Sequence, residues 1–143
     1  MNRRLSLALA LLALAPVAAP ALDVTVTVTG IRNAKGKIAA LAFSNKTGFP
    51  DQPDKALARA VVDARKGTVS LTLKNLPPGK LAITVLHDED GNGKLNRNLF
   101  HLPLEGAGMS GKPEGKLPPT FADAVEQFDH SRKLSIPLRY WSK

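Results

Sequence analysis

Oxygen-bearing side chains alternate along one acidic stretch of the sequence, DEDGNGKL at residues 88–95. The first, third and fifth positions carry Asp88, Asp90 and Asn92, and Gly93 follows as a residue that permits a sharp turn. Calcium is a hard cation that takes several oxygen ligands, and alternate side chains of a curling segment converge on one point. We therefore expect calcium to bind these three side chains and the backbone carbonyl of Lys94.

The same stretch lacks a ligand that tight calcium loops of this spacing carry. In an EF-hand loop the twelfth residue is a glutamate that binds the ion with both oxygens, whereas here it is Leu99. We expect weak binding, with a dissociation constant of about 10⁻⁴ to 10⁻³ M, in which Glu105 could replace that glutamate. The alternative is a turn whose side chains accept hydrogen bonds from their own backbone. The sequence leaves both open.

Polar residues around this stretch also suggest a catalytic alternative. A small hydrolase could use His87 with Asp88 or Glu105 as acid and base. His101 and Ser110 lie close in the sequence, but Ser110 lacks the turn context of a hydrolase nucleophile, and no spacing here specifies a triad. We therefore predict a protein that is not an enzyme and has no catalytic residues.

Two large aromatic side chains near the C-terminus, Tyr140 and Trp141, allow a third interpretation. As core anchors they would be buried, whereas exposed and flat they could stack on a sugar ring, as in a carbohydrate-binding module. The three histidines, by contrast, are dispersed and show no paired spacing typical of a transition-metal site.

The start of the chain has the composition of a signal peptide. Arg3 and Arg4 make it basic, residues 5–15 are apolar, and small residues mark a cleavage site after Ala21. The apolar run is shorter than the ~20 residues that a membrane-spanning helix needs. We therefore expect the chain up to Ala21 to be removed, and residues 22–143 to form one periplasmic or extracellular domain without a membrane span.

Composition narrows the function classes further. The chain of 143 residues contains no cysteine, which excludes disulfides, zinc–thiolate sites and a thiol nucleophile. Its net charge of +8 becomes +6 when the two arginines of the leader are subtracted (8 − 2 = 6), and the lysines are spread through turns. Only 5% of residues are aromatic, so the stacking platforms of nucleic-acid sites are missing. We expect an envelope protein or an anionic polysaccharide as partner, and no nucleic acid.

Hydrophobic alternation predicts an all-β fold. Valines and threonines alternate along residues 23–30, which indicates a strand with one buried face, and residues 37–43 are almost wholly apolar. Residues 80–88 place Leu81, Ile83, Val85 and His87 on one face. Further strands are expected at 59–64, 68–73 and 132–140. About seven short strands with at most one or two short helices predict an antiparallel β-sandwich.

Turn signals predict how these strands connect. Residues 33–36 suggest an opening hairpin, and Lys66 with Gly67 suggests a second one. Glycines and prolines lead us to expect a long loop from residue 89 to 119, followed by a short helix within residues 121–127. Pro137 cannot donate to a strand ladder, so the last strand should lie at an edge or contain a bulge.

Several short motifs occur in the order found in a known family. They are V-x-V-x-G at 26–30, G-K-I-A-A-L-A-F at 36–43, L-P-P-G at 76–79, H-D-x-D-x-N-G-K-L at 87–95, P-x-E-G-x-G-x-S at 103–110 and P-x-F-x-x-A at 119–124. In these motifs the chain resembles a widespread family of exported bacterial proteins classed as a domain of unknown function. The resemblance spans the mature chain and implies a fold and recurring positions, but no mechanism.

The L-P-P-G motif carries a second resemblance. It is similar to the inter-strand turn of transthyretin-like and carboxypeptidase-regulatory-like β-sandwiches, which implies the same fold class, although Leu81 stands where those domains usually have tyrosine. The chain also departs from the first family at four positions, one of which is His101, near a usual glycine. Asn96 replaces a common aspartate, which removes charge from the expected ion site, and Ala107 and Met109 replace aromatic residues.

Overall fold

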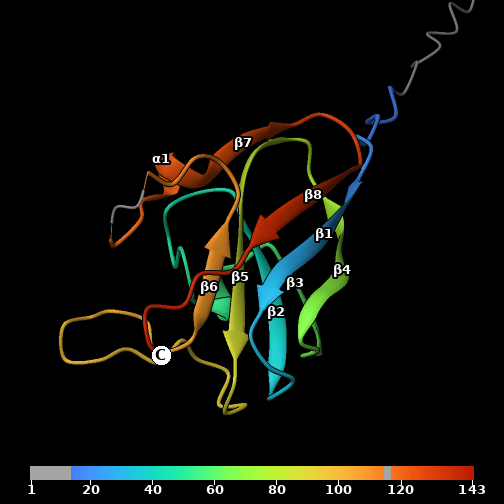
Figure 1. The fold of residues 1–143 in the computed structure, drawn as a ribbon. Helices are drawn as coiled ribbons and strands as arrows, with labels where there is room; N and C mark the ends of the chain where they lie inside the picture. The colour runs from blue at the N-terminus through green and yellow to red at the C-terminus, as the bar shows by residue number, and fades with distance from the viewer. Residues whose placement is uncertain (1–13, 115–116) are drawn as a thin grey trace, which may run out of the picture.

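Two β-sheets stacked face to face make up the protein in this computed structural model, which describes residues 14–114 and 117–143 (Figure 1). The first sheet has the strand order β4-β1-β8, with β1 at Leu22–Ile31, β4 at Gly67–Leu76 and β8 at Arg132–Pro137. The second has the order β3-β2-β5-β6, and β7 also pairs with β5. Its strands are β2 at Lys37–Phe43, β3 at Ala58–Asp63, β5 at Gly79–Asp88, β6 at Gly106–Met109 and β7 at Val125–Phe128. The predicted all-β sandwich is confirmed.

The predicted leader adjoins the first strand. Residues 1–13 lie outside the described residues, and residues 14–21 are exposed without regular secondary structure. Strand β1 begins at Leu22, directly after the predicted cleavage site, and the cleavage itself stays a prediction. Among the described residues, no helix has the length and apolar character needed to cross a membrane.

The valine face of β1 fills the centre of the core. Val24, Val26 and Val28 are fully buried, while the threonines between them are half-buried, as the alternation predicted. Strand β4 pairs with β1 in the antiparallel sense, but β8 pairs with its other side in the parallel sense. The expectation of a purely antiparallel sandwich is corrected at this pair. Pro137 does lie in an edge strand, as its missing N–H required.

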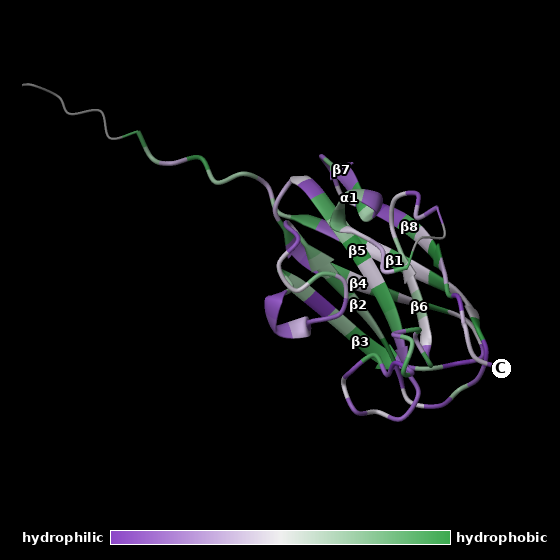
Figure 2. Cartoon of the chain, turned by 90° about the vertical axis from the view of Figure 1, so that its left-hand side faces the viewer, coloured by the Kyte–Doolittle hydropathy of each residue, from purple (hydrophilic) through white to green (hydrophobic). Residues whose placement is uncertain are grey.

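Strand β5 is apolar on both faces because both are covered. Its inner face, including Ile83 and Val85, belongs to the core between the sheets. On its outer face Leu86 joins Leu41 and Phe43 in a smaller cluster, against which Phe49 of the β2–β3 connection packs. Figure 2 shows this distribution, with hydrophobic residues concentrated along the strands and hydrophilic residues in the loops.

Both predicted hairpins are wrong. Strand β1 belongs to the first sheet and β2 to the second, and the same holds for β4 and β3, so each predicted turn carries the chain from one sheet to the other. A turn signal marks where a chain reverses, but strands that hydrogen-bond and strands that stack face to face can follow the same reversal.

Two smaller expectations also need correction. The expected loop of residues 89–119 contains β6, whose glycines have low strand propensity but which pairs with β5. The helix expected within residues 121–127 is limited to α1, Phe121–Ala124, and the chain continues directly as β7. A single 3-10 turn, Pro53–Lys55, precedes β3.

Truncating the core should destabilise the fold strongly. Ile83 is fully buried, so Ile83→Ala is expected to lower the free energy of unfolding by about 2–5 kcal/mol through lost burial and the cavity that remains. Val61→Ala is the matched control, because Val61 is 49% exposed and should cost less than about 0.5 kcal/mol. Urea unfolding of both variants checks the difference, and equal losses would contradict the assigned core.

Candidate functional site

The acidic stretch lies at one end of the sandwich, where β5 ends at Asp88 and the chain turns toward β6 (Figure 1). Carboxylate oxygens of Asp88, Asp90 and Glu105 all lie within 4.8 Å of one another. Glu105 immediately precedes β6, so strand pairing between β5 and β6 carries it back to the turn. The structure thus brings together the expected aspartates and the glutamate expected to complete the set.

The turn is held by its own side chains. Asp88 accepts hydrogen bonds from the backbone N–H of Asn92 (3.1 Å) and of Gly93 (2.7 Å). Asn92 in turn accepts one from the backbone of Lys94 through its side-chain oxygen (2.8 Å). These are the local hydrogen bonds of the alternative interpretation. These hydrogen bonds are present in the same structure in which the three carboxylates converge. The hydrogen-bonded turn and the acidic cluster are therefore compatible.

Two amide groups face Asp90. The side-chain nitrogens of Asn92 and Asn96 lie 3.2 and 2.7 Å from Asp90 Oδ2, so this oxygen accepts two hydrogen bonds. Together with the backbone N–H of Asn92, the bond from Asn96 lowers the pKa of Asp90 below its usual value, because both favour the charged form. Asn92 therefore presents nitrogen to the cluster, and it must turn its amide over to give oxygen to a cation.

Glu105 joins the two halves of the loop. It is only 4% exposed, and one carboxylate oxygen accepts the backbone N–H of Glu89 (2.9 Å) while the other accepts that of Asn96 (3.0 Å). Each bond uses one lone pair, and a carboxylate oxygen offers two. Glu105 can therefore hold the loop and still face Asp88 and Asp90.

A buried network below the cluster contains residues that the sequence did not identify together. His87 is fully buried, and its Nε2 lies 2.8 Å from the carbonyl oxygen of Lys35. A carbonyl only accepts, so Nε2 carries the proton and Nδ1 accepts from the Tyr140 hydroxyl at 2.7 Å. That hydroxyl accepts the backbone N–H of Arg32 (3.2 Å). Burial raises the pKa of Tyr140, which keeps the phenol protonated.

Arg32 connects this network to Glu89 in the acidic stretch at residues 88–95. Its Nε and Nη2 lie 2.6 and 3.1 Å from the two carboxylate oxygens of Glu89, and its Nη1 donates to the carbonyl of Ser142 (2.8 Å). The guanidinium also lies over the Tyr140 ring, 4.4 Å from its centroid. This pairing lowers the pKa of Glu89, because a bidentate arginine stabilises the carboxylate. No sequence pattern marks Arg32, since its partners are 57 and 108 positions away.

Two groups of the hydrolase alternative, His87 and Ser110, hydrogen-bond within the buried fold. Both nitrogens of His87 are engaged and shielded from solvent, which leaves no lone pair for a substrate. Ser110 is also buried, donating to the carbonyl of Ala124 (2.6 Å) and accepting the N–H of Ile83 (2.8 Å). His101 is exposed in the loop before β6.

The two C-terminal aromatic residues have different surroundings. Tyr140 is half-buried between Arg32 and His87, and its hydroxyl is used by both. It therefore acts as an anchor of the fold instead of a flat sugar platform. Trp141 is 36% exposed and lines a cavity on the outer face of the second sheet.

Comparison with known proteins gives one result. The family model described as "Uncharacterized protein conserved in bacteria (DUF2141)" matches residues 26–135, which is more than half of the chain. The chain belongs to this family. No curated protein and no solved structure matches it. Membership covers both sheets and the acidic loop, while the resemblance of L-P-P-G to transthyretin-like domains stays a prediction.

Removing the Tyr140 hydroxyl should destabilise the fold without altering its shape. Tyr140→Phe leaves the buried Nδ1 of His87 without a partner, which is expected to cost about 1–3 kcal/mol of unfolding free energy. Ser70→Ala removes a hydroxyl from the exposed Thr27–Ser70 pair and should cost less than about 0.5 kcal/mol. Urea unfolding compares them, and a harmless Tyr140→Phe would contradict the proposed network.

The Arg32–Glu89 pair should make stability depend on pH in a defined direction. Because the folded-state pKa of Glu89 lies below its ordinary value of 4.5, the pair's contribution is present above that value and is lost as the pH falls through the folded-state pKa. Glu89→Gln should therefore lower the unfolding free energy at pH 7 and flatten its decline in acid. Urea titrations at several pH values test this, with the exposed Glu114→Gln as a control whose profile should match wild type.

Proposed function

We propose that the protein is a non-enzymatic binding or scaffolding module of the bacterial envelope whose acidic loop binds calcium. The observation that carries the proposal is the convergence of Asp88, Asp90 and Glu105. Among the described residues, none of these three carboxylates has a basic side chain within 4.0 Å. Like charges this close repel one another, and a shared divalent cation removes that repulsion.

The donor set suits calcium better than a transition metal. The converging side chains offer oxygen only, and calcium prefers carboxylate, amide and carbonyl oxygens. Asn92 would contribute after turning its amide over, and Lys94 would contribute its backbone carbonyl. His87 donates no atom to the ion, because both of its nitrogens are already bonded.

The position of the loop supports a bridging role. Asp90, Gly91 and Asn92 are exposed, so an ion held there would keep ligand positions open to solvent. An anionic polysaccharide or an acidic protein surface could fill these positions with its own oxygens. Weak affinity of about 10⁻⁴ to 10⁻³ M, typical of extracellular calcium modules, suits the periplasmic or extracellular location that we predicted from the leader.

Calcium should raise the stability of the protein, and one carboxylate should control the effect. At ten times the dissociation constant, binding to the folded state alone adds about 1.4 kcal/mol to the free energy of unfolding. Melting curves of residues 22–143 in calcium and in chelator measure the shift, and Asp90→Asn is expected to abolish it. Asp129→Asn is the matched control, since Asp129 follows β7 and is exposed. A calcium-dependent rise in stability that persists in Asp90→Asn, or no rise in the wild type, would contradict the proposal.

A further inference from the structure

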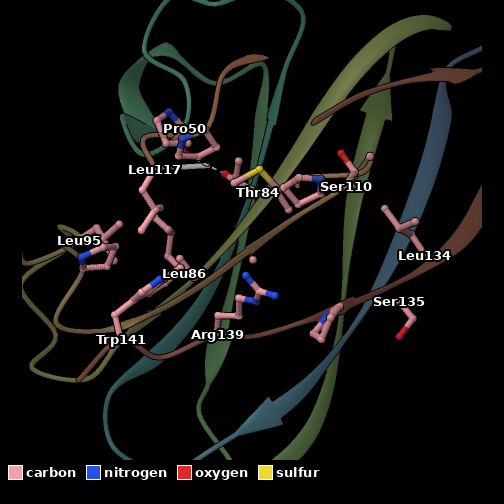
Figure 3. Close-up of a pocket in the computed structure, with 18 of the residues that line it drawn as sticks. Pro50, Thr84, Leu86, Leu95, Ser110, Leu117, Leu134, Ser135, Arg139 and Trp141 are labelled. Atoms are coloured by element: carbon pink, nitrogen blue, oxygen red, sulfur yellow. Dashed lines mark hydrogen bonds between the residues drawn. The ribbon is translucent and has the colours of Figure 1, made fainter. Parts of the chain in front are cut away.

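A cavity of about 340 Å³ opens beside β5, β6 and the C-terminal segment (Figure 3), and none of Asp88, Asp90 and Glu105 lines it. Its size is at the lower end of the range for small-molecule sites, about 300–1,000 Å³. One wall is apolar and comes from β5, β6 and the following loops, through Leu86, Leu95, Ala107 and Met109. The residues that line the cavity come from segments that are far apart in the sequence, so no local sequence motif predicts it.

The opposite wall is one face of the C-terminal strand and its extension. Alternate residues from Ser135 to Trp141 line the cavity here, namely Ser135, Pro137, Arg139 and Trp141, and Leu134 also contributes. This segment lies beside β6 because Ala107 and Arg139 exchange two backbone hydrogen bonds, of 3.0 and 2.9 Å. Small Ala107 leaves the space between the walls open. Strand pairing thus fixes the spacing of the two walls, and loop residues such as Pro50, Pro103 and Leu117 complete the lining.

Three charged residues line this cavity, and two of them are neutralised by neighbours. Arg97 forms an ion pair with Asp51 at 2.6 Å, and Glu126 is paired with Arg132. Arg139 differs, because its guanidinium forms no hydrogen bond or ion pair with any of the described residues. Figure 3 shows the Arg139 side chain among the residues that surround the space. The site therefore combines an apolar lining with one positive charge that is left for a ligand.

We propose that this cavity binds a single-chain amphiphilic carboxylate, with its acyl chain against Leu86, Leu95 and Met109 and its carboxylate beside Arg139. Burying the chain removes apolar surface from water, which supplies the attraction. The guanidinium then fixes the orientation, because its planar fork matches two carboxylate oxygens. An alcohol of the same chain length can bury its chain but has no carboxylate for the Arg139 guanidinium.

The single tryptophan of the sequence reports on this site directly. Trp141 lines the cavity, so its fluorescence should shift to shorter wavelength when dodecanoate fills it. A chain brominated at its end, 12-bromododecanoate, should quench the same emission by contact. The titrations are done below the micelle concentration and in chelator, which separates them from any effect of calcium.

Two variants test the two halves of the site. Arg139→Gln should weaken dodecanoate binding about fivefold to tenfold and leave dodecan-1-ol binding unchanged, whereas Arg65→Gln, which removes an equal charge outside the cavity, should change neither. Ala107→Phe fills the space and should abolish quenching by the brominated chain, with circular dichroism confirming that the variant is folded.

Three results would overturn the proposal. Absence of quenching at millimolar 12-bromododecanoate would show that the cavity does not take an acyl chain. Equal affinity of wild type and Arg139→Gln for dodecanoate would remove the role of the guanidinium. Binding to phosphatidylglycerol vesicles without binding to monomeric dodecanoate would assign the surface to a lipid bilayer instead.

Discussion

The close contact between β6 and the C-terminal segment is the constraint on which the rest of the structure depends. It requires two residues without side chains, because a Cβ atom at Gly106 would lie 2.5 Å from the Tyr140 ring and one at Gly108 would lie 2.5 Å from the carbonyl oxygen of Pro137. With glycine at both positions, the edge of one sheet reaches the edge of the other. Glu105 enters the acidic cluster just before this contact, and the cavity opens over its outer side. The Gly106-Ala107-Gly108 segment of β6 therefore positions both the acidic cluster and the cavity.

Much of the strand pattern could be predicted from the sequence, because burial repeats with a period of two along β1, and β5 is a short apolar run that is buried on both faces. The sequence could not predict which strands hydrogen-bond to each other and which stack face to face, since both arrangements produce the same alternation of buried and exposed residues. The parallel pair of β1 and β8 has no local signal for the same reason. Strand β6 was missed because its two glycines match a loop composition, although their role is to let another segment approach.

For the candidate sites, contacts between residues close in the sequence could be predicted, and contacts between residues far apart in the sequence could not. The side chains of Asp88, Asp90 and Asn92 are close in sequence, so their spacing alone indicates a shared turn. Arg32 and Tyr140 belong to the same end of the molecule only through contacts across 108 positions. His87 shows how far the two cases differ, because a histidine beside a carboxylate resembles an acid–base pair until its buried partners are known.

The position of β1 also governs the order in which the chain can fold. It is the central strand of the first sheet, yet one of its two partners is distant in the sequence, because Val24 of β1 pairs with Arg132 of β8, 132 − 24 = 108 positions later. The first sheet therefore cannot be completed until β8 is available, and such non-local pairing is slow to form.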